Sequence, residues 1–342
     1  MNLRTASIRA TASTALLGKP ELSSDDVAAL SGISSEQAGR LWQALGFPSV
    51  MPDEKIFTRR DVDVLRFIHD LFAQGALDPD VLVQTARATG QSLARIANMH
   101  VLSMAQQIEA AVRSGELSDS GAADRVAAIA EGIVASHEPF LSYIWRRHLL
   151  AAISQTAASA GEKAGEGESS VVGFADLVDF TAMSERMTER ELAAVVDRFE
   201  AIAYQEIPDR GGRVIKMLGD EVMFHNADAV AGADTALALS RACAADDLLP
   251  AVRVGLALGP TLAWEGDVYG RTVNLASRLV GVARPGTVLL SDELAQRVQA
   301  GTDLVLRELP PTRLKGIGRA RIWVLRAPEK ETVDDQRRRK RD

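Results

Sequence analysis

Two aspartates stand where short apolar segments end or turn. Asp176 lies near the end of the run VVGFADLV, and Asp220 lies in the turn of the segment MLGDEV. If the strand and the hairpin that carry them are neighbours in one sheet, the two carboxylates can hold a pair of Mg²⁺ ions, which would stabilise an in-line displacement at phosphorus. The alternative is structural: Asp220 forms a turn, and Asp176 caps a strand end.

A second pair of polar residues lies in the segment EGDVYGRTVNLASRL, over 265–279. Asn274 and Arg278 are four positions apart, so they share one face of a helix. An amide and a guanidinium on that face suit a ribose oxygen and a phosphorus centre. The alternative is the polar face of an amphipathic helix.

The rest of the sequence limits the choice of chemistry. It has no GxxxxGK[ST] loop, no GxGxxG after a strand and no HExxH, and its five histidines form no ligand cluster. The net charge of −7 argues against a broad nucleic-acid footprint, and the single cysteine, Cys243, fits a reducing compartment. No apolar run reaches the roughly 18 residues of a membrane span. At 342 residues, we expect a cytoplasmic protein of two domains.

The first half has helical periodicity. Ser23 or Ser24, Ser34 and Thr58 are candidate N-caps, and Pro139 is expected to break or start a helix. Residues 22–48 also have helix-turn-helix spacing, but their few scattered basic residues suit DNA poorly. We therefore predict an all-α domain over 1–155 and a flexible linker over 156–170, where the sequence is TAASAGEKAGEGESS.

The second half alternates between short apolar strands and helices. The expected order is a strand, a helix, a hairpin, a helix and a strand, followed by another helix and strand; the ranges are 171–178, 184–206, 211–226, 228–245, 251–259, 272–283 and 287–291. This is the β-α-β-β-α-β order of a ferredoxin-like core. We predict an α+β domain over 171–328 and a charged tail over 329–342.

Five segments of the second half, in this order, resemble the class III nucleotidyl cyclase catalytic domain: FADLVDFT, IKMLGDEVMF, VRVGLALG, DVYGRTVNLASR and LKGIGRARIWVL. The resemblance covers about residues 170–326. It implies that Asp176 and Asp220 bind two metal ions, Mg²⁺ or Mn²⁺. It further implies that Lys216 and Asp267 read the purine and that Asn274 and Arg278 act on the transition state. The resemblance also implies that Arg253 and Lys315 contact the triphosphate, and that the backbone at Phe180 and Thr181 binds phosphate oxygens.

The chemistry of Lys216 and Asp267 predicts which purine base is bound. Adenine offers an amine donor to Asp267 and a ring acceptor to Lys216, whereas guanine reverses both groups. We therefore predict an adenylate cyclase that converts ATP to cyclic AMP and pyrophosphate. The alternatives are guanylate cyclase activity and a catalytically weak cyclase fold with a regulatory role. A diguanylate cyclase is suggested only by the LGDE turn.

The resemblance also implies an assembly. In this family one chain supplies the metal-binding aspartates and the other supplies the base-reading and transition-state residues, so we expect a head-to-tail homodimer with two equivalent sites. The sequence departs from the family at Asp179, where most members have glycine, and has a short stretch between Gly259 and Asp267.

The helical half resembles the regulatory domain of some actinobacterial cyclases, which responds to pH in some members. Histidine is the side chain that commonly acts as a charge switch near neutral pH, so one hypothesis is that His100, His137 and His148 bias two packing states. The alternative is that they have no special role. We expect no nucleic-acid partner and no membrane segment, and we consider a proton or a small apolar molecule as an effector.

Overall fold

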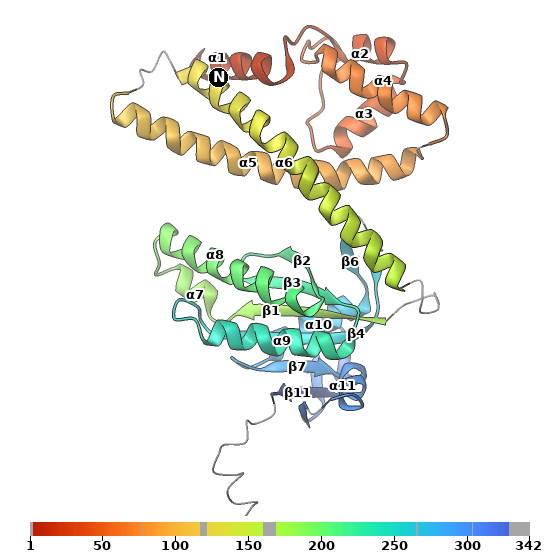
Figure 1. Ribbon diagram of the computed structural model, residues 1–342, viewed down its shortest axis with the longest axis vertical. Helices are drawn as coiled ribbons and strands as arrows, with labels where there is room; N and C mark the ends of the chain where they lie inside the picture. The colour runs from red at the N-terminus through yellow and green to blue at the C-terminus, as the bar shows by residue number, and fades with distance from the viewer. Residues whose placement is uncertain are drawn as a thin grey trace, which may run out of the picture. The chain divides into compact units, whose positions relative to one another are not determined.

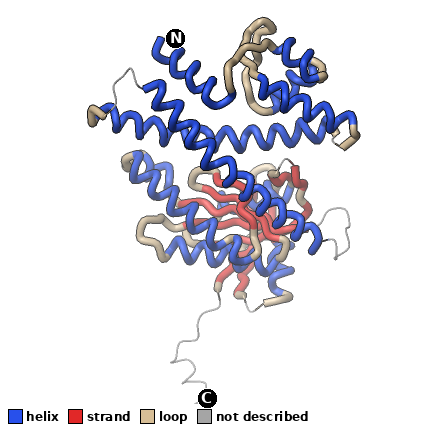
Figure 2. The backbone as a smooth tube through the Cα atoms, turned by 45° about the horizontal axis from the view of Figure 1, so that its top comes forward, coloured by secondary structure: helices blue, strands red, loops and turns tan. Residues whose placement is uncertain are grey.

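The computed structural model describes residues 3–76, 78–116, 122–159, 169–264, 266–302 and 304–327. Its internal contacts divide the chain into two units, Met1–Lys163 and Ala164–Asp342. Among the described residues, helices build the first unit, and the extended strands all belong to the second (Figures 1 and 2). The predicted tail over 329–342 lies outside the described residues.

The first unit contains six α-helices in its described part: α1 (Leu3–Leu17), α2 (Ser24–Ser31), α3 (Ser35–Ala44), α4 (Arg59–Ala73), α5 (Pro79–Arg113) and α6 (Ala122–Ser159). Three of them begin at capping boxes, where Ser23, Ser34 and Thr58 exchange hydrogen bonds with side chains three residues later. These are the predicted N-caps, so local sequence sets the helix starts.

A small core joins α2 and α4. Val27 and Val62 are buried there with Leu22 and Phe57, which form an isolated β-bridge. The helix-turn-helix spacing therefore corresponds to a folded motif, but α3 carries a single basic residue, Arg40.

The helix α6 corrects two expectations. Pro139 lies inside it and does not break it. The proline removes one backbone hydrogen bond, and helix-forming residues on both sides continue the helix. The helix also extends to Ser159, into the range predicted as a linker. Residues 160–168 of that range lie outside the described residues.

The second unit is built on a seven-stranded sheet with the order β2-β3-β1-β4-β7-β11-β8. Its strands are β1 (Ser169–Leu177), β2 (Arg213–Met217), β3 (Glu221–Asn226), β4 (Val252–Pro260), β7 (Val288–Ser291), β8 (Val305–Glu308) and β11 (Ile322–Arg326). The strands β2, β3, β1 and β4 are antiparallel neighbours and form the predicted ferredoxin-like core. The expected α+β fold class is confirmed.

Two small hairpins and several helices complete this unit. The hairpins are β5 (Leu262–Trp264) with β6 (Asp267–Tyr269), and β9 (Thr312–Leu314) with β10 (Gly318–Ala320). The helices are α7 (Phe180–Ser184), α8 (Glu189–Glu206), the 3₁₀ turn η2 (Pro208–Arg210), α9 (Ala229–Ala244), α10 (Arg271–Val282) and α11 (Asp292–Gln299). The helix predicted over 184–206 begins later than expected, at Glu189, because Thr188 caps it, and the separate short helix α7 ends at Ser184.

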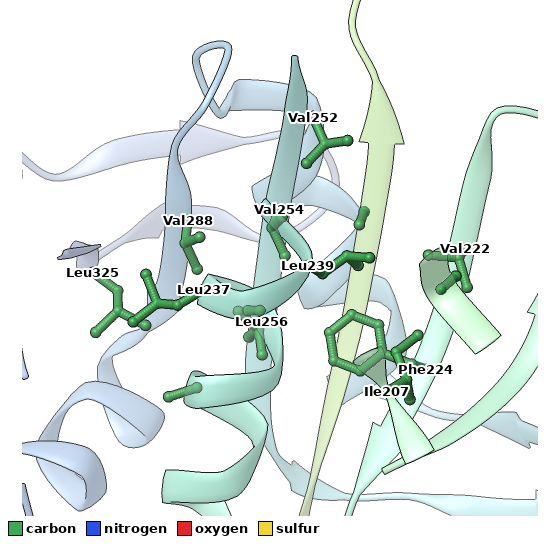
Figure 3. Packing of buried hydrophobic residues seen from close by; sticks show 14 of the residues in the cluster. Ile207, Val222, Phe224, Leu237, Leu239, Val252, Val254, Leu256, Val288 and Leu325 are labelled. Atoms are coloured by element: carbon green, nitrogen blue, oxygen red, sulfur yellow. The ribbon is translucent and has the colours of Figure 1, made fainter. Parts of the chain in front are cut away.

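The sheet is covered on both faces, and the alternation of side chains decides which residues reach which helix. Val252, Val254 and Leu256 of β4 point to one face, where Figure 3 shows them beside Leu237 and Leu239 of α9. Residues of α8 and α11 belong to the same core cluster. Val172 and Phe174 of β1 point to the opposite face, where Ala276 and Val280 of α10 cover them. The register places four residues of the site described below on this second face: Asp176, Lys216, Glu221 and Arg253.

None of the helices in the described ranges combines the length and the apolar character needed to cross a membrane.

Candidate active site

The structure places Asp176 and Asp220 at one corner of the sheet. Asp176 pairs with Glu221 across β1 and β3, and Asp220 is the residue before Glu221. The amide of Leu177 donates to the carbonyl of Asp220 at 3.0 Å, which ties the β2–β3 turn to the end of β1. Gly219 in this turn has φ +75°, a conformation that favours glycine. The predicted neighbourhood of the two aspartates is therefore present.

Asp176 is bound to Arg253 of β4. Both residues lie on the α10 face in direct register. The Oδ2 atom of Asp176 accepts a hydrogen bond from Arg253 Nε at 2.7 Å, and Nη2 lies 2.5 Å from the same oxygen in an ion pair. Burial raises the pKa of Asp176, the Arg253 guanidinium opposes this shift, and the Asp220 charge adds to it. The arginine expected to contact triphosphate thus neutralises a metal-binding candidate here.

Glu221 is a member of this cluster that sequence reasoning missed. Burial raises its pKa to about 7, and the charges of Asp176 and Asp220 contribute to the shift. The signal that could have identified Glu221 is its position directly after Asp220. Once β3 pairs with β1, Glu221 lies opposite Asp176 and shares its face of the sheet.

This corner fits a divalent cation by its donor chemistry. Carboxylate oxygens are the ligands that Mg²⁺ and Mn²⁺ prefer, and the mutual repulsion of the carboxylates shows an excess of negative charge. Among the described residues, no group of three or more acidic, histidine or cysteine side chains is arranged to hold a metal ion on its own. If the two aspartates bind metal ions as predicted, they would supply only part of a coordination shell, and substrate oxygens would complete it.

Lys216 and Asp267 form an ion pair with 2.5 Å between Nζ and Oδ2. A β-bulge in β2 between Val214 and Lys216 places Lys216 opposite Met223, on the α10 face. Burial alone raises the pKa of Asp267, but the hydrogen bonds from Lys216 and from the amide of Val268 bring it below the ordinary value. The two predicted base readers are thus brought together from β2 and β6.

Asn274 and Arg278 lie on the exposed face of α10, while Ala276, Leu279 and Val280 on its other face are buried. Neither polar side chain has a hydrogen-bond or ion-pair partner among the described residues. They are available to a ligand or to another chain.

The remaining predicted residues lie on separate elements. Lys315 is exposed in the turn between β9 and β10. Phe180 and Thr181 form the first turn of α7, preceded by Asp179 at φ 57°. Asp179 is the only non-glycine residue with positive φ in the described part of the chain, and its side chain makes no capping hydrogen bond. The glycine typical of the family would remove this strain.

In the helical unit, two of the three predicted histidines meet. The rings of His100 on α5 and His137 on α6 have centroids 4.3 Å apart, and the Nε2 atom of His100 is buried without a hydrogen-bond partner. His137 Nδ1 lies 3.0 Å from the Ser136 hydroxyl. His148 is exposed and does not join this pair.

The helical unit also contains a cavity of about 570 Å³. Apolar side chains of α2 to α5 form most of its lining, among them Leu41, Trp42, Phe57 and Leu82.

Comparison with known proteins covers both units. Residues 3–152 match the family described as adenylate cyclase regulatory domain, and residues 163–327 match the adenylate and guanylate cyclase catalytic domain. An adenylate cyclase of Glutamicibacter nicotianae is 35% identical over 326 residues, which cover 91% of this chain and 80% of the relative. The chain belongs to the adenylate cyclase family.

Two further adenylate cyclases support this assignment. One from Streptomyces coelicolor is 38% identical over 274 residues, covering 78% of this chain and 69% of the relative. A pH-sensitive adenylate cyclase of Mycobacterium tuberculosis is 30% identical over 337 residues, covering 93% of this chain and 83% of the relative. The resemblance drawn from the sequence motifs is confirmed, and with it the enzyme class. Catalytic domains of this family depend on divalent metal ions.

Proposed function

We propose that this adenylate cyclase converts ATP to 3′,5′-cyclic AMP and pyrophosphate at sites formed by two copies of the chain. The observation that carries the choice of substrate is the ion pair between Lys216 and Asp267 at 2.5 Å. The pair presents one donor and one acceptor side by side, which matches the ring nitrogen and the amine of adenine. Guanine would set a donor against Lys216 and an acceptor against Asp267.

The chemical roles follow from charge and position. The ribose 3′-oxygen attacks the α-phosphorus, a new P–O bond forms, and the bond to pyrophosphate breaks in line, while the hydroxyl proton passes to solvent or substrate. Asn274 orients the ribose, and Arg278 stabilises the charge that develops at phosphorus. Arg253 and Lys315 bind the triphosphate and the leaving pyrophosphate, and the backbone at Phe180 and Thr181 binds a phosphate oxygen.

Asp176 and Asp220 would hold the divalent ions, which we propose to be two Mg²⁺ or Mn²⁺ ions per site. When bound, such ions neutralise the triphosphate and lower the pKa of the 3′-hydroxyl. Arg253 occupies Asp176 Oδ2 through a hydrogen bond and an ion pair in the structure, so this oxygen would bind a metal ion only after Arg253 releases it. The freed guanidinium would then be available to the phosphates.

Each chain carries both sets of residues once. We therefore propose a head-to-tail homodimer, in which Asp176 and Asp220 of one protomer act with Lys216, Asp267, Asn274 and Arg278 of its partner. The exposure of Asn274 and Arg278, without partners among the described side chains, supports this arrangement.

We also propose that the helical domain regulates the catalytic domain in response to pH. The buried, unpartnered Nε2 of His100 beside His137 supports the proposal, because two protonated rings with centroids 4.3 Å apart would repel each other and loosen α5 against α6. A small apolar effector in the helical cavity is a second candidate. The domain limits 1–155 and 171–328 and the cytoplasmic location remain proposals.

Product analysis tests the proposed reaction. The full chain is incubated with ATP and, separately, with GTP, under Mg²⁺ and under Mn²⁺, and the products are separated by chromatography. We expect cyclic AMP from ATP and little cyclic GMP. Asp267→Asn should lower kcat/KM for ATP by about 10- to 100-fold, whereas Asp209→Asn, at an exposed aspartate of η2, should not. No cyclic nucleotide under any condition would refute the enzymatic role, and preferred use of GTP would refute the base assignment.

A further inference from the structure

A third polar residue shares the exposed face of α10 with Asn274 and Arg278. Arg271 precedes Asn274 by three positions and Arg278 by seven, which places all three on one helical stripe. At 100° per residue, Arg271 and Arg278 differ in direction by only about 20°. Arg271 is exposed, as the other two are.

The position of Arg271 is fixed by its neighbours. The hydroxyl of Thr272 donates to the carbonyl of Pro260 at 2.7 Å, and Thr272 is buried. Gly270, with φ 133°, connects β6 directly to α10, and a Cβ at this position would lie 3.5 Å from the same carbonyl. The start of α10 is thus anchored to the end of β4.

The fold itself does not use the Arg271 side chain. It has no hydrogen-bond or ion-pair partner within the described part of the chain, and the first turn of α10 contains no acidic residue. A positive charge in the first turn of a helix is also unfavourable to the helix dipole. The stability of α10 therefore gives no reason for an arginine here.

The order of residues along the chain indicates which part of the substrate Arg271 meets. Asp267 of β6 reads the purine edge, Asn274 orients the ribose and Arg278 faces the α-phosphorus. Arg271 lies between Asp267 and Asn274, about 4.5 Å along the helix axis before Asn274, while Arg278 lies about 6 Å after it. Arg271 is therefore on the nucleoside side of Asn274, and Arg278 is on the phosphate side.

We propose that Arg271 is a further substrate-binding residue whose guanidinium packs against the face of the purine ring. The proposal rests on the proposed function, because Lys216 and Asp267 occupy the purine edge and leave its face open. A planar guanidinium stacks on an aromatic ring, whereas the ammonium of lysine is compact and strongly hydrated. Arg271 acts with the base readers of its own protomer.

The test compares Arg271→Gln and Arg271→Lys in the full chain. Arg271→Gln should raise KM for ATP about tenfold, the effect of one cation–π contact that is shielded from water, and leave kcat within about twofold. Inhibition by adenosine should weaken by a similar factor, while inhibition by inorganic pyrophosphate stays unchanged. Arg271→Lys should restore little. The control is Arg307→Gln, at an exposed arginine of β8 that lies outside the site.

Two results would overturn the proposal: unchanged KM and adenosine inhibition in Arg271→Gln, or a weakened pyrophosphate inhibition, which would place Arg271 on the phosphates. Direct calorimetric binding of adenosine to the wild-type protein and to Arg271→Gln does not depend on turnover. A wild-type protein that binds adenosine but forms no cyclic AMP would therefore refute the proposed reaction separately.

Discussion

Asp176 and Arg253 face each other directly across β1 and β4, and a single carboxylate oxygen accepts a hydrogen bond from Nε of the guanidinium and forms an ion pair with its Nη2. The Asp176 side chain is only 12% exposed, so removal of its partner leaves a poorly solvated charge. We predict that Arg253→Gln lowers the free energy of unfolding by about 1–3 kcal/mol in metal-free buffer. Urea denaturation measures this change.

The double variant Arg253→Gln with Asp176→Asn provides the control for this interaction. It removes the charge that Arg253 neutralises, so it should recover part of the lost stability. If Arg253→Gln is as stable as the wild-type protein, the ion pair contributes nothing to the fold.

Glu221 makes stability depend on pH. The folded protein holds its proton up to about pH 7, whereas the unfolded chain releases it near the ordinary pKa of 4.5. The folded state binds more protons between these values, so the free energy of unfolding should fall as pH rises through this window. Glu221→Gln should reduce that fall, measured by urea denaturation with EDTA present. The pKa of Asp176 is also raised, so this residue should contribute a pH dependence of the same sign that remains in Glu221→Gln.

Asp179 adopts φ 57° without a capping hydrogen bond. Asp179→Gly should raise the free energy of unfolding by about 0.5–1 kcal/mol, because glycine adopts this conformation without a clash at Cβ. Asp179→Ala removes the carboxylate but keeps Cβ, so it should not stabilise the protein. Equal stability of the two variants would show that charge, and not backbone strain, matters at this position.

Some features of the fold follow from local sequence, whereas others depend on contacts that the sequence does not reveal. The helix starts at Ser23, Ser34 and Thr58 follow from local hydrogen bonds, and the strands around Asp176 follow from their apolar runs. The predicted break at Pro139 was wrong, because the stability of a 38-residue helix depends on residues far from the proline.

The bulge that turns Lys216 to the α10 face could not be predicted either. With regular pairing Lys216 would lie opposite Val222, which points into the core on the other face. The motif therefore predicted Lys216 as a base reader, but only the register shows how Lys216 reaches Asp267. The same holds for Arg253, since its pairing with Asp176 depends on the register of β1 with β4.

We predict that replacing both His100 and His137 changes the pH dependence of the reaction. We expect the double variant His100→Gln with His137→Gln to flatten the dependence of the cyclase rate on pH around neutrality, where histidine serves as a charge switch. The exposed His148→Gln is the matched control and should leave the profile unchanged. A pH profile that is identical in the double variant and the wild-type protein would contradict the proposed role of the pair.

The shared site is the central claim, and mixing two inactive variants tests it most directly. Asp176→Ala and Asn274→Ala should each lose at least about 100-fold in rate, because each removes one half of the machinery. In an equimolar mixture that exchanges subunits, half of the dimers are mixed and each has one intact site, so about a quarter of the wild-type rate should return. A mixture of Asp176→Ala with Asp220→Ala, which damage the same half, should remain inactive. Recovery only in the first mixture supports the shared site, whereas no recovery in a mixture shown to contain mixed dimers would contradict it.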